Sequence, residues 1–301
     1  MNVPSITVVM SSYNGEKNIS RQLDSLFGQE GVDVKVFVRD DGSTDNTWNV
    51  LEQYKNEKQP KRLLLQKGEN CGWRKSFMLA LLAAPETEYF AFSDQDDVWF
   101  SNKLIRCIKK IQDCPSDDVI MVHHNRCRCS VDLAPLPDTA KRLERPLNLK
   151  NALIQEYAQG CTMVFNKAAW RLIKRFEPKS NIPHDLWVGM LCYYFGKVFF
   201  VDEPLIYHIQ YGTNASTTGN VLAGRLKRLK MFLDRAVYVN PADDLLCGFG
   251  ELIQDQQFLL DLKNYKKSLA KRLKIFFDRE FVRSNLMGTI SLKMAVLLGK
   301  I

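Results

Sequence analysis

Residues 89–99 read YFAFSDQDDVW, an apolar run that ends abruptly in three carboxylates, those of Asp94, Asp96 and Asp97. A short apolar run bounded by polar residues is typical of a buried β-strand. The same arrangement occurs three times earlier in the chain, where polar residues follow the apolar runs 6–10, 34–38 and 62–65. We therefore predict four strands, each of which ends in polar groups.

Segments of helical length separate these runs and cover residues 18–27, 47–54 and 76–82. Strands alternate with helices where a parallel sheet is covered by helices on both faces, and strands buried on both faces have continuous apolar runs. The predicted fold class is therefore α/β. Because ligands of such sheets bind outside the carboxyl ends of the strands, we expect the site in the loops after them.

Those loops are residues 11–15, 39–45, 69–72 and 93–97, and all are polar. Asn, Asp, Gly and Ser also form turns and helix caps, so one such loop would indicate little, whereas four in succession favour a binding site. No glycine-rich phosphate loop of the G-x-G-x-x-G or G-x-x-x-x-G-K-[ST] type follows a predicted strand. Carboxylates suit Mg2+ or Mn2+, which bridge phosphate oxygens, and this favours a nucleotide diphosphate ligand.

The composition is that of a soluble globular protein, because 46% of the 301 residues are apolar and 25% are charged. The first residues lack the features of a secretion signal, and no stretch approaches the ~20 apolar residues of a membrane span. We expect a cytoplasmic protein with eight reduced cysteines. The cluster His123, His124, Cys127 and Cys129 lacks paired C-x2-C spacing, so thiols without a metal are the preferred interpretation.

Five segments resemble the family 2 glycosyltransferases of the GT-A fold: VVMSSYN (8–14), DDGSTD (40–45), SDQDDVW (93–99), GCTMVFN (160–166) and HDLW (184–187). The third and fifth are similar to the rhamnosyltransferase-like branch, which builds O-antigen, capsule and other bacterial surface polysaccharides. The resemblance covers residues 4–215 and implies a Rossmann-like, mostly parallel sheet covered by helices. It implies a catalytic domain over residues 1–215, and the pattern of the remaining residues predicts a basic amphipathic helical region over 216–301.

The resemblance implies an inverting enzyme that moves rhamnose or another hexose from a UDP- or dTDP-sugar to an acceptor hydroxyl, expected on a lipid-linked saccharide. In the family pattern the D-x-D pair, here Asp94 and Asp96, contacts the donor ribose and holds the divalent cation, Mn2+ or Mg2+. Asp97 is a further candidate ligand of this cation. The alternative is a catalytically inactive scaffold or nucleotide-binding component of a polysaccharide assembly complex, which would have lost these carboxylates.

The same resemblance places the nucleoside among Ser11, Tyr13, Asn14, Asp40 and Asp41. A carboxylate there can accept a hydrogen bond from the N–H of uracil or thymine, which favours UDP or dTDP.

Further donor contacts are expected later in the chain. Gly72 and Lys75 follow the third strand, where Lys75 either meets a phosphate or is solvated. Trp187, like Trp99, either offers an aromatic face to a sugar ring or belongs to the core.

Asp185 matches the family's catalytic carboxylate, at the start of a helical pattern that continues through Met190. Inversion requires a base that takes the proton of the attacking hydroxyl. The alternative is a carboxylate that only complements the helix dipole. The family often places a histidine, which completes the metal or diphosphate site, where Tyr211 stands here, so His208 is the candidate from a shifted register.

Basic residues concentrate near the end of the chain, where residues 211–301 contain fifteen Lys and Arg against eight Asp and Glu. Segments 221–236 and 258–277 have the pattern of basic amphipathic helices. Their apolar stripes either pack on the catalytic domain or attach to an anionic membrane surface. Because lipid-linked acceptors lie in membranes, we expect peripheral attachment to the inner face of the cell membrane. We expect no nucleic-acid partner, because no nucleic-acid motif accompanies the charge.

Overall fold

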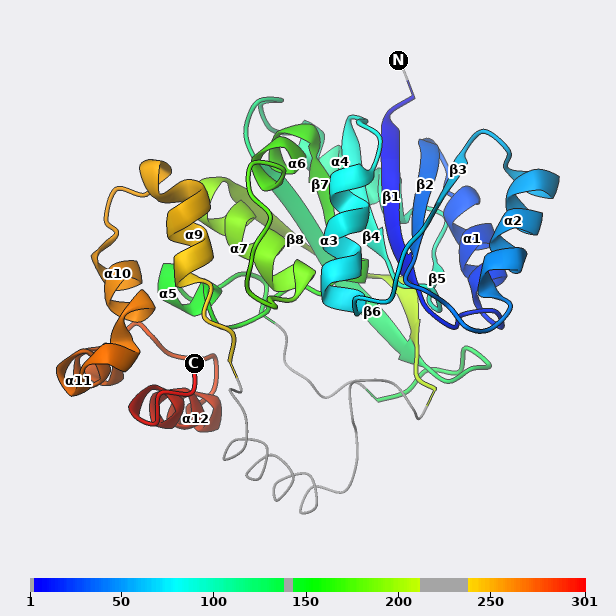
Figure 1. The fold of residues 1–301 in the computed structure, drawn as a ribbon. Helices are drawn as coiled ribbons and strands as arrows, with labels where there is room; N and C mark the ends of the chain where they lie inside the picture. The colour runs from blue at the N-terminus through cyan, green and yellow to red at the C-terminus, as the bar shows by residue number, and fades with distance from the viewer. Residues whose placement is uncertain (1–2, 138–142, 212–237) are drawn as a thin grey trace. The chain divides into compact units, whose positions relative to one another are not determined.

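The computed structural model describes residues 3–137, 143–211 and 238–301 (Figure 1). The chain forms two compact units. The first unit comprises Met1–Arg145, Ala158–Lys174 and Pro183–Tyr211, and the second comprises Pro146–Tyr157, Arg175–Ile182 and Gly212–Ile301. The second unit thus includes two short segments from within the range 1–215 that we expected to form one domain.

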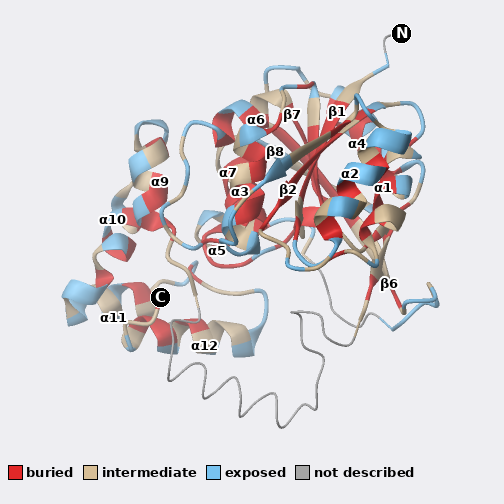
Figure 2. Cartoon of the chain, turned by 45° about the vertical axis from the view of Figure 1, so that its right-hand side comes forward, coloured by how far each residue is buried: buried red, intermediate tan, exposed pale blue. Residues whose placement is uncertain are grey.

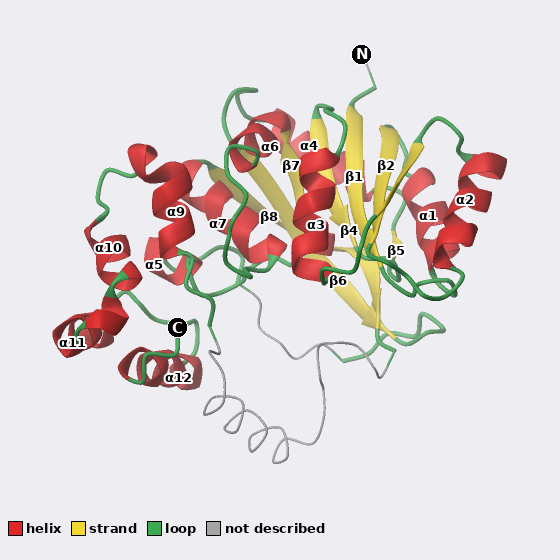
Figure 3. Cartoon of the chain, viewed as in Figure 1, coloured by secondary structure: helices red, strands yellow, loops and turns green. Residues whose placement is uncertain are grey.

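In the described residues, eight strands form one sheet in the order β3-β2-β1-β4-β7-β6-β8-β5 (Figure 3). Their bounds are β1 (Ser5–Ser12), β2 (Asp33–Asp40), β3 (Leu63–Lys67), β4 (Tyr89–Ser93), β5 (Val98–Trp99), β6 (Ile120–Cys129), β7 (Val164–Asn166) and β8 (Lys197–Ile209). The four predicted strands, β1 to β4, pair in parallel. β6 and β8 are also parallel, whereas β7 and β5 pair antiparallel with their neighbours, so the whole sheet is mixed.

Helices of the first unit cover both faces of this sheet. One face contacts α1 (Ile19–Phe27), α2 (Thr47–Lys58) and α4 (Lys103–Gln112), and the other contacts α3 (Trp73–Ala83), α6 (Lys167–Ile173) and α7 (His184–Phe195). Val8 and Met10 of β1 share a hydrophobic cluster with Leu23 of α1 and Leu104 of α4. Both faces of β1 are buried, which explains its continuous apolar run and confirms the α/β prediction.

The register of the parallel strands brings their carboxyl ends to one edge of the sheet. Ser12 at the end of β1 pairs with Asp40 at the end of β2, and Asp40 pairs with Lys67 at the end of β3. Met10 pairs with Ser93, the last residue of β4. The four polar loops therefore leave the sheet at the same edge.

The second unit is helical in its described residues. It contains α5 (Leu149–Ala152), α9 (Ala242–Phe249), α10 (Gln257–Lys263), α11 (Leu269–Phe277) and α12 (Leu286–Leu297). Within residues 3–137, 143–211 and 238–301, no helix has both the length and the apolar character needed to cross a bilayer.

The helix expected over residues 258–277 is interrupted, which corrects that prediction. α10 ends at Lys263, a short 3-10 turn spans Tyr265–Lys267, and α11 begins only after Ser268, which has extended backbone. The buried Tyr265 hydroxyl donates to the backbone oxygen of Ile301 at 2.7 Å and ties the chain down at the break. The other expected amphipathic helix, over residues 221–236, lies outside the described residues.

Candidate active site at the strand ends

Asp40 joins the loops after β1 and β2 and is only 1% exposed. Its carboxylate accepts hydrogen bonds from the hydroxyl of Ser12 at 3.1 Å and from the amide of Ser43 at 3.0 Å. The Ser43 hydroxyl donates to it as well. Asp40 therefore holds the turn at residues 40–43 in place.

Asp41 fixes the loop that precedes α3. It forms a buried ion pair with Arg39, at 2.5 Å, and accepts the backbone amides of Cys71 and Gly72 at 3.0 and 2.9 Å. Burial raises the pKa of this carboxyl, but the hydrogen bonds from Cys71 and Arg39 outweigh that effect and the net pKa is lowered. Like Asp40, Asp41 is engaged by donors of the protein, but one oxygen of each carboxylate accepts a single backbone amide and retains capacity for a further hydrogen bond. The structure thus shows that both carboxylates also hold the loop framework, and their contact with a nucleoside stays a prediction.

Tyr13 and Asn14 connect the loop after β1 to its neighbours. The side chain of Gln95 accepts the amide of Tyr13 at 2.9 Å and donates to the carbonyl of Tyr13 at 3.0 Å. Asn14 has a φ of 49° and its side chain accepts the amide of Thr44 at 2.8 Å. The ring of Tyr13 is 45% exposed and is available to stack on a base. Gln95, the middle residue of the D-x-D pattern, is a structural link that the sequence analysis missed.

The remaining residues expected near the donor surround the start of α3. Ser11 donates to the hydroxyl of Ser76 on α3 at 2.6 Å. Gly72 has a φ of 82°, in the left-handed region that disfavours a side chain, and Lys75 is exposed in the first turn of the helix. The structure therefore leaves Lys75 free to reach a ligand while Ser11 is engaged.

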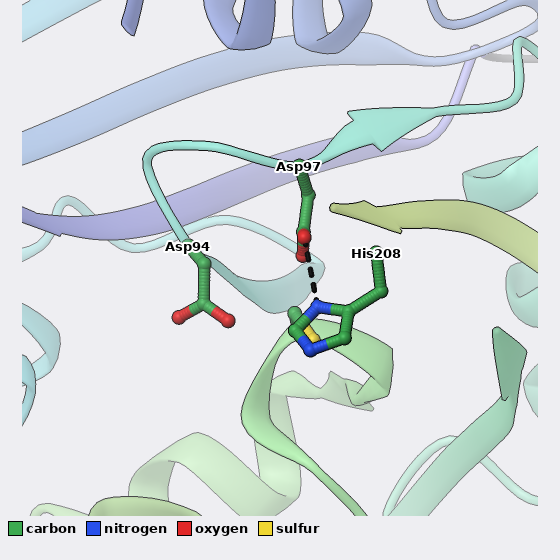
Figure 4. A group of neighbouring side chains, drawn as sticks. Asp94, Asp97 and His208 are labelled. Carbon is green, nitrogen blue, oxygen red and sulfur yellow. Dashed lines mark hydrogen bonds and ion pairs between the residues drawn. The ribbon is translucent and has the colours of Figure 1, made fainter. Parts of the chain in front are cut away.

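Four side chains from distant parts of the chain converge beyond β4. Asp94 and Asp97 come from the loop after β4, Cys161 from the 3-10 turn Gly160–Thr162 and His208 from β8. One possible ligand atom from each residue lies within 4.8 Å of the other three. The Nδ1 atom of His208 is 2.9 Å from a carboxylate oxygen of Asp97 (Figure 4).

The carboxyls of this loop disfavour one another's charge. Burial, followed by the charges of Asp97 and Asp96, raises the pKa of Asp94 to about 7. Burial and the charge of Asp97 raise the pKa of Asp96 to about 6. A bound cation relieves this kind of repulsion. Ligands that lie about 2.0–2.6 Å from one ion are at most roughly 5 Å apart, so the positions of these atoms suit a single cation. The carboxylates and the imidazole fit the divalent cation that the fold implies, whereas burial raises the pKa of the Cys161 thiol and makes it a poor ligand for Mn2+ or Mg2+.

The composition of this group differs from the predicted set of Asp94, Asp96 and His208. The structure brings Asp94 and His208 together, adds Asp97 and Cys161, and leaves Asp96 outside. The backbone oxygen of Asp96 instead accepts the hydroxyl of Tyr211 at 3.3 Å, and Tyr211 also accepts a bond from Arg21 at 3.0 Å. Tyr211 therefore anchors the loop at the position where the family often has a histidine.

Buried Lys103 lies behind the cluster and was missed by the sequence analysis. Its ammonium donates to the carbonyl of Cys161 at 2.7 Å and lies 3.0 Å from the ring centroid of Trp99. Burial lowers the pKa of Lys103 to about 7. Trp99 and Trp187 are 3% and 0% exposed, so the core interpretation applies to both and Trp187 offers no face to a sugar.

Asp185 lies in the first turn of α7, is 9% exposed and accepts the amide of Leu186 at 2.8 Å. Its neighbour His184 stacks on Phe77, with the two ring centroids 4.1 Å apart. Burial lowers the pKa of His184 to about 4. A Cβ at Gly160 would lie 2.4 Å from Nε2 of His184. The GCTMVFN and HDLW segments therefore meet in space, and only glycine at position 160 allows this contact.

The other metal-compatible cluster in the sequence has ordinary hydrogen bonds. A ring nitrogen of His123 lies 2.6 Å from the carbonyl of Glu144, and one of His124 lies 2.6 Å from the carbonyl of Asn125. All eight cysteines lie in the described residues and have free thiols.

Comparisons with known proteins identify the family of this chain. The family model described as Glycosyl transferase family 2 matches residues 7–173. The dTDP-rhamnosyl transferase RfbG of Shigella flexneri is 30% identical over 233 residues, which cover 73% of this chain and 78% of RfbG. An uncharacterized glycosyltransferase of Nostoc sp. is 28% identical over 215 residues, which cover 69% of this chain and 66% of that protein.

Solved structures share the fold at low identity. S. aureus TarS in complex with UDP-GlcNAc has a TM-score of 0.56 and 18% identity, with 92% of this chain and 77% of the other covered. The mannosyltransferase PcManGT of Pyrobaculum calidifontis, in complex with GDP-Man and Mn2+, has a TM-score of 0.53 and 16% identity, with coverages of 99% and 81%. Because the family model spans more than half of the chain and includes the loops after β1 to β4, this chain belongs to the family 2 glycosyltransferases and has their GT-A fold.

Proposed function

We propose that this protein transfers a hexose from a UDP- or dTDP-sugar to a hydroxyl of a lipid-linked saccharide, with inversion, in the synthesis of a bacterial surface polysaccharide. The observation that carries the proposal is the group Asp94, Asp97, Cys161 and His208 at the carboxyl edge of the sheet. Ligands of α/β sheets bind at this edge. A cation held at this edge would lie next to a bound nucleotide diphosphate.

The relatives support the donor class. RfbG is named a dTDP-rhamnosyl transferase, and TarS has been solved with UDP-GlcNAc and with UDP. Among the described residues, the exposed ring of Tyr13 is available to contact a base and the exposed ammonium of Lys75 a phosphate. Rhamnose is one candidate sugar, supported by the 30% identity to RfbG.

Asp94, Asp97 and His208 would hold a divalent cation, Mn2+ or Mg2+, with the Cys161 thiol beside it. When bound, the cation neutralises negative charge that develops on the departing diphosphate. Asp96 lies beside this group and is the candidate for a contact to the donor ribose. Lys103, through the carbonyl of Cys161, fixes the turn that carries the thiol.

Asp185 is the proposed base. Its carboxylate takes the proton of the attacking hydroxyl while the hydroxyl oxygen forms a bond to the anomeric carbon. The bond from that carbon to the phosphate oxygen breaks, and its electron pair leaves with the diphosphate. The neutral, buried imidazole of His184 is packed against Phe77 and Phe92 and keeps the start of α7 in place.

Two Escherichia coli relatives support a lipid-linked acceptor. WfaP and WfgD are named UDP-Glc:alpha-D-GlcNAc-diphosphoundecaprenol beta-1,3-glucosyltransferases and are 25% and 32% identical over 99 and 100 residues. An enzyme that acts on such an acceptor works at a membrane surface. We place this protein at the inner face of the cell membrane as a peripheral protein.

The Asp185→Asn variant tests the reaction. We expect it to lower the transfer rate by at least a hundredfold, because the base is lost, and to leave UDP affinity unchanged, because the base acts on the acceptor. Transfer and calorimetric UDP binding are measured on the same preparations. Asp24→Asn, which removes an exposed carboxylate paired with Lys58, is the control and should retain both.

If UDP affinity falls together with transfer, Asp185 binds the donor and is not the base. If the unaltered protein neither binds a nucleotide nor transfers a sugar, it is an inactive scaffold and the proposed function is wrong.

A further inference from the structure

Helices α11 and α12 of the second unit each have an exposed apolar stripe. On α11 the side chains of Leu269, Leu273 and Phe277 are 66%, 40% and 72% exposed. The exposed apolar residues of α12 are Leu286 (74%), Met287 (74%), Ile290 (48%) and Met294 (43%), and Leu298 (47%) follows at the end of the helix. Residues three or four positions apart lie on the same side of a helix, so each set forms one continuous stripe. Figure 2 shows exposed residues along both helices.

The two helices that carry the stripes are fixed to each other. Lys293 of α12 donates to the carbonyls of Ile275 at 3.1 Å and Asp278 at 2.6 Å, and Arg272 of α11 donates to the carbonyl of Leu297 at 3.2 Å. Other side chains of the same helices are buried, with Ile275 at 1% and Leu292 at 0% exposed. The stripes therefore belong to packed helices, and large exposed apolar patches on packed elements mark interaction surfaces.

The residues around the stripes are strongly basic. Residues 263–300 include ten Lys and Arg and only two Asp and Glu, which are Asp278 and Glu280. Both acidic side chains pair with Lys150 of α5. Lys263, Lys271 and Lys274 pair with Asp243 and Asp261, which lie outside this range, whereas within the described part of the chain Lys266, Lys267 and Arg279 form no ion pair. The surface thus combines apolar side chains with uncompensated positive charge.

We infer that the α11–α12 stripes insert into the interfacial region of a bilayer that contains anionic phospholipid. This inference rests on the proposed function, which places the acceptor in a membrane, and identifies the surface that contacts the lipid. Leucine, methionine and phenylalanine side chains enter the boundary of the acyl chains, and nearby ammonium and guanidinium groups contact lipid phosphates.

Charge complementarity favours lipid over two other occupants. A second copy would bring an equally basic surface against this one. Residues 212–237 of the same chain contain five basic residues and one acidic residue, so they would also add like charge. Anionic lipid satisfies the apolar and the charged parts of the surface together.

The test is co-sedimentation of the full chain with vesicles of phosphatidylcholine and phosphatidylglycerol. We expect the double variant Phe277→Ser and Met287→Ser to partition at least tenfold less, because two of the most exposed apolar side chains are removed. Its melting temperature and UDP affinity should be unchanged, because both side chains are more than 70% exposed. Leu252→Ser, which alters an exposed leucine (44%) of the same unit outside the stripes, is the control and should bind as the unaltered protein does.

Three results would overturn the inference: no binding of the unaltered protein to these vesicles, equal binding to vesicles of phosphatidylcholine alone, or unchanged binding of the double variant. A lower mass of the double variant in sedimentation equilibrium, with vesicle binding unchanged, would assign the stripes to a second copy. Vesicle binding without nucleotide binding or transfer would contradict the proposed function and leave the lipid surface standing.

Discussion

At the scale of single residues, the site depends on which side chains the fold brings to the β4 loop. Asp94 and Asp96 follow from the sequence pattern, and the raised pKa values of both are consistent with a site for a cation. The pairing of Asp97 with His208 joins residues 111 positions apart and depends on the path of β8. Cys161 stands in the GCTMVFN segment, which gave no sign that its thiol would face the carboxylates. Contacts over such distances are set by tertiary structure and are invisible in one sequence.

Asp97→Asn tests which carboxylates hold the cation. We expect Mn2+ affinity, measured by calorimetry in the presence of UDP, to fall by about 10- to 100-fold, because the variant removes a charged ligand and the partner that orients His208. Asp96→Asn should have a smaller effect, because Asp96 lies outside the cluster. Asp24→Asn should have none. A larger loss from Asp96→Asn than from Asp97→Asn would restore the original D-x-D assignment.

His184 should make the folded protein sensitive to acid. Burial lowers the pKa of His184 from 6.5 to about 4. Between these pH values the unfolded state binds more protons than the folded state, so the folded protein loses stability as the pH decreases. The contribution is complete above pH 6.5, is lost as the pH approaches 4 and amounts to about 3 kcal/mol of unfolding free energy. We expect His184→Gln to remove this part of the slope in urea unfolding measured from pH 7 to 4.5. Parallel pH dependences for the two proteins would show that His184 does not titrate in this way.

At the scale of elements, the first four strands and three helices were predictable because each has one clear period and a polar boundary. The bounds of α1 and β4 differ from the prediction by a single residue. The break between α10 and α11 was not predictable, because the tie between Tyr265 and Ile301 joins residues far apart in the sequence. Polar residues at strand ends were interpreted as ligand contacts, and the structure shows that Asp40 and Asp41 also connect loops. Turn chemistry and binding chemistry use the same residue types, and sequence cannot separate them.

Asp41→Asn should destabilise the loop before α3. It breaks a buried ion pair, with side chains 7% and 2% exposed, and leaves the charge of Arg39 uncompensated. Breaking such a pair costs about 3–5 kcal/mol of unfolding free energy, measurable by urea titration. Glu203→Gln breaks the exposed pair with Arg106 and should cost at most about 1 kcal/mol. Equal losses in the two variants would mean that burial of the Arg39–Asp41 pair does not matter.

At the scale of the whole molecule, the excess of positive charge and the candidate active site lie in different parts of the sequence. Residues 1–210 contain 27 basic and 26 acidic residues, so the excess of positive charge belongs to the rest. The first unit, which leaves out residues 146–157 and 175–182 of this range, contains 24 basic and 24 acidic residues and has a repelling group of carboxyls at the strand-end site. A negatively charged nucleotide diphosphate should bind there only when a divalent cation compensates both charges. We therefore expect nucleotide binding to depend on the cation.

Thermal unfolding with UDP, dTDP, GDP and CMP, each with and without Mn2+, tests this dependence and the donor class together. A ligand that binds only the folded state stabilises it by about 2.7 kcal/mol at a concentration of 100 times its dissociation constant. For a protein of this size we expect a rise of several degrees in melting temperature with UDP or dTDP and Mn2+. Much smaller rises are expected without the cation, or with GDP or CMP. The Asp97→Asn variant is the matched control and should lose most of the effect of Mn2+ while it keeps its own melting transition. Equal stabilisation by UDP with and without Mn2+ would mean that the donor binds without the cluster, and a preference for GDP would exclude both proposed donors.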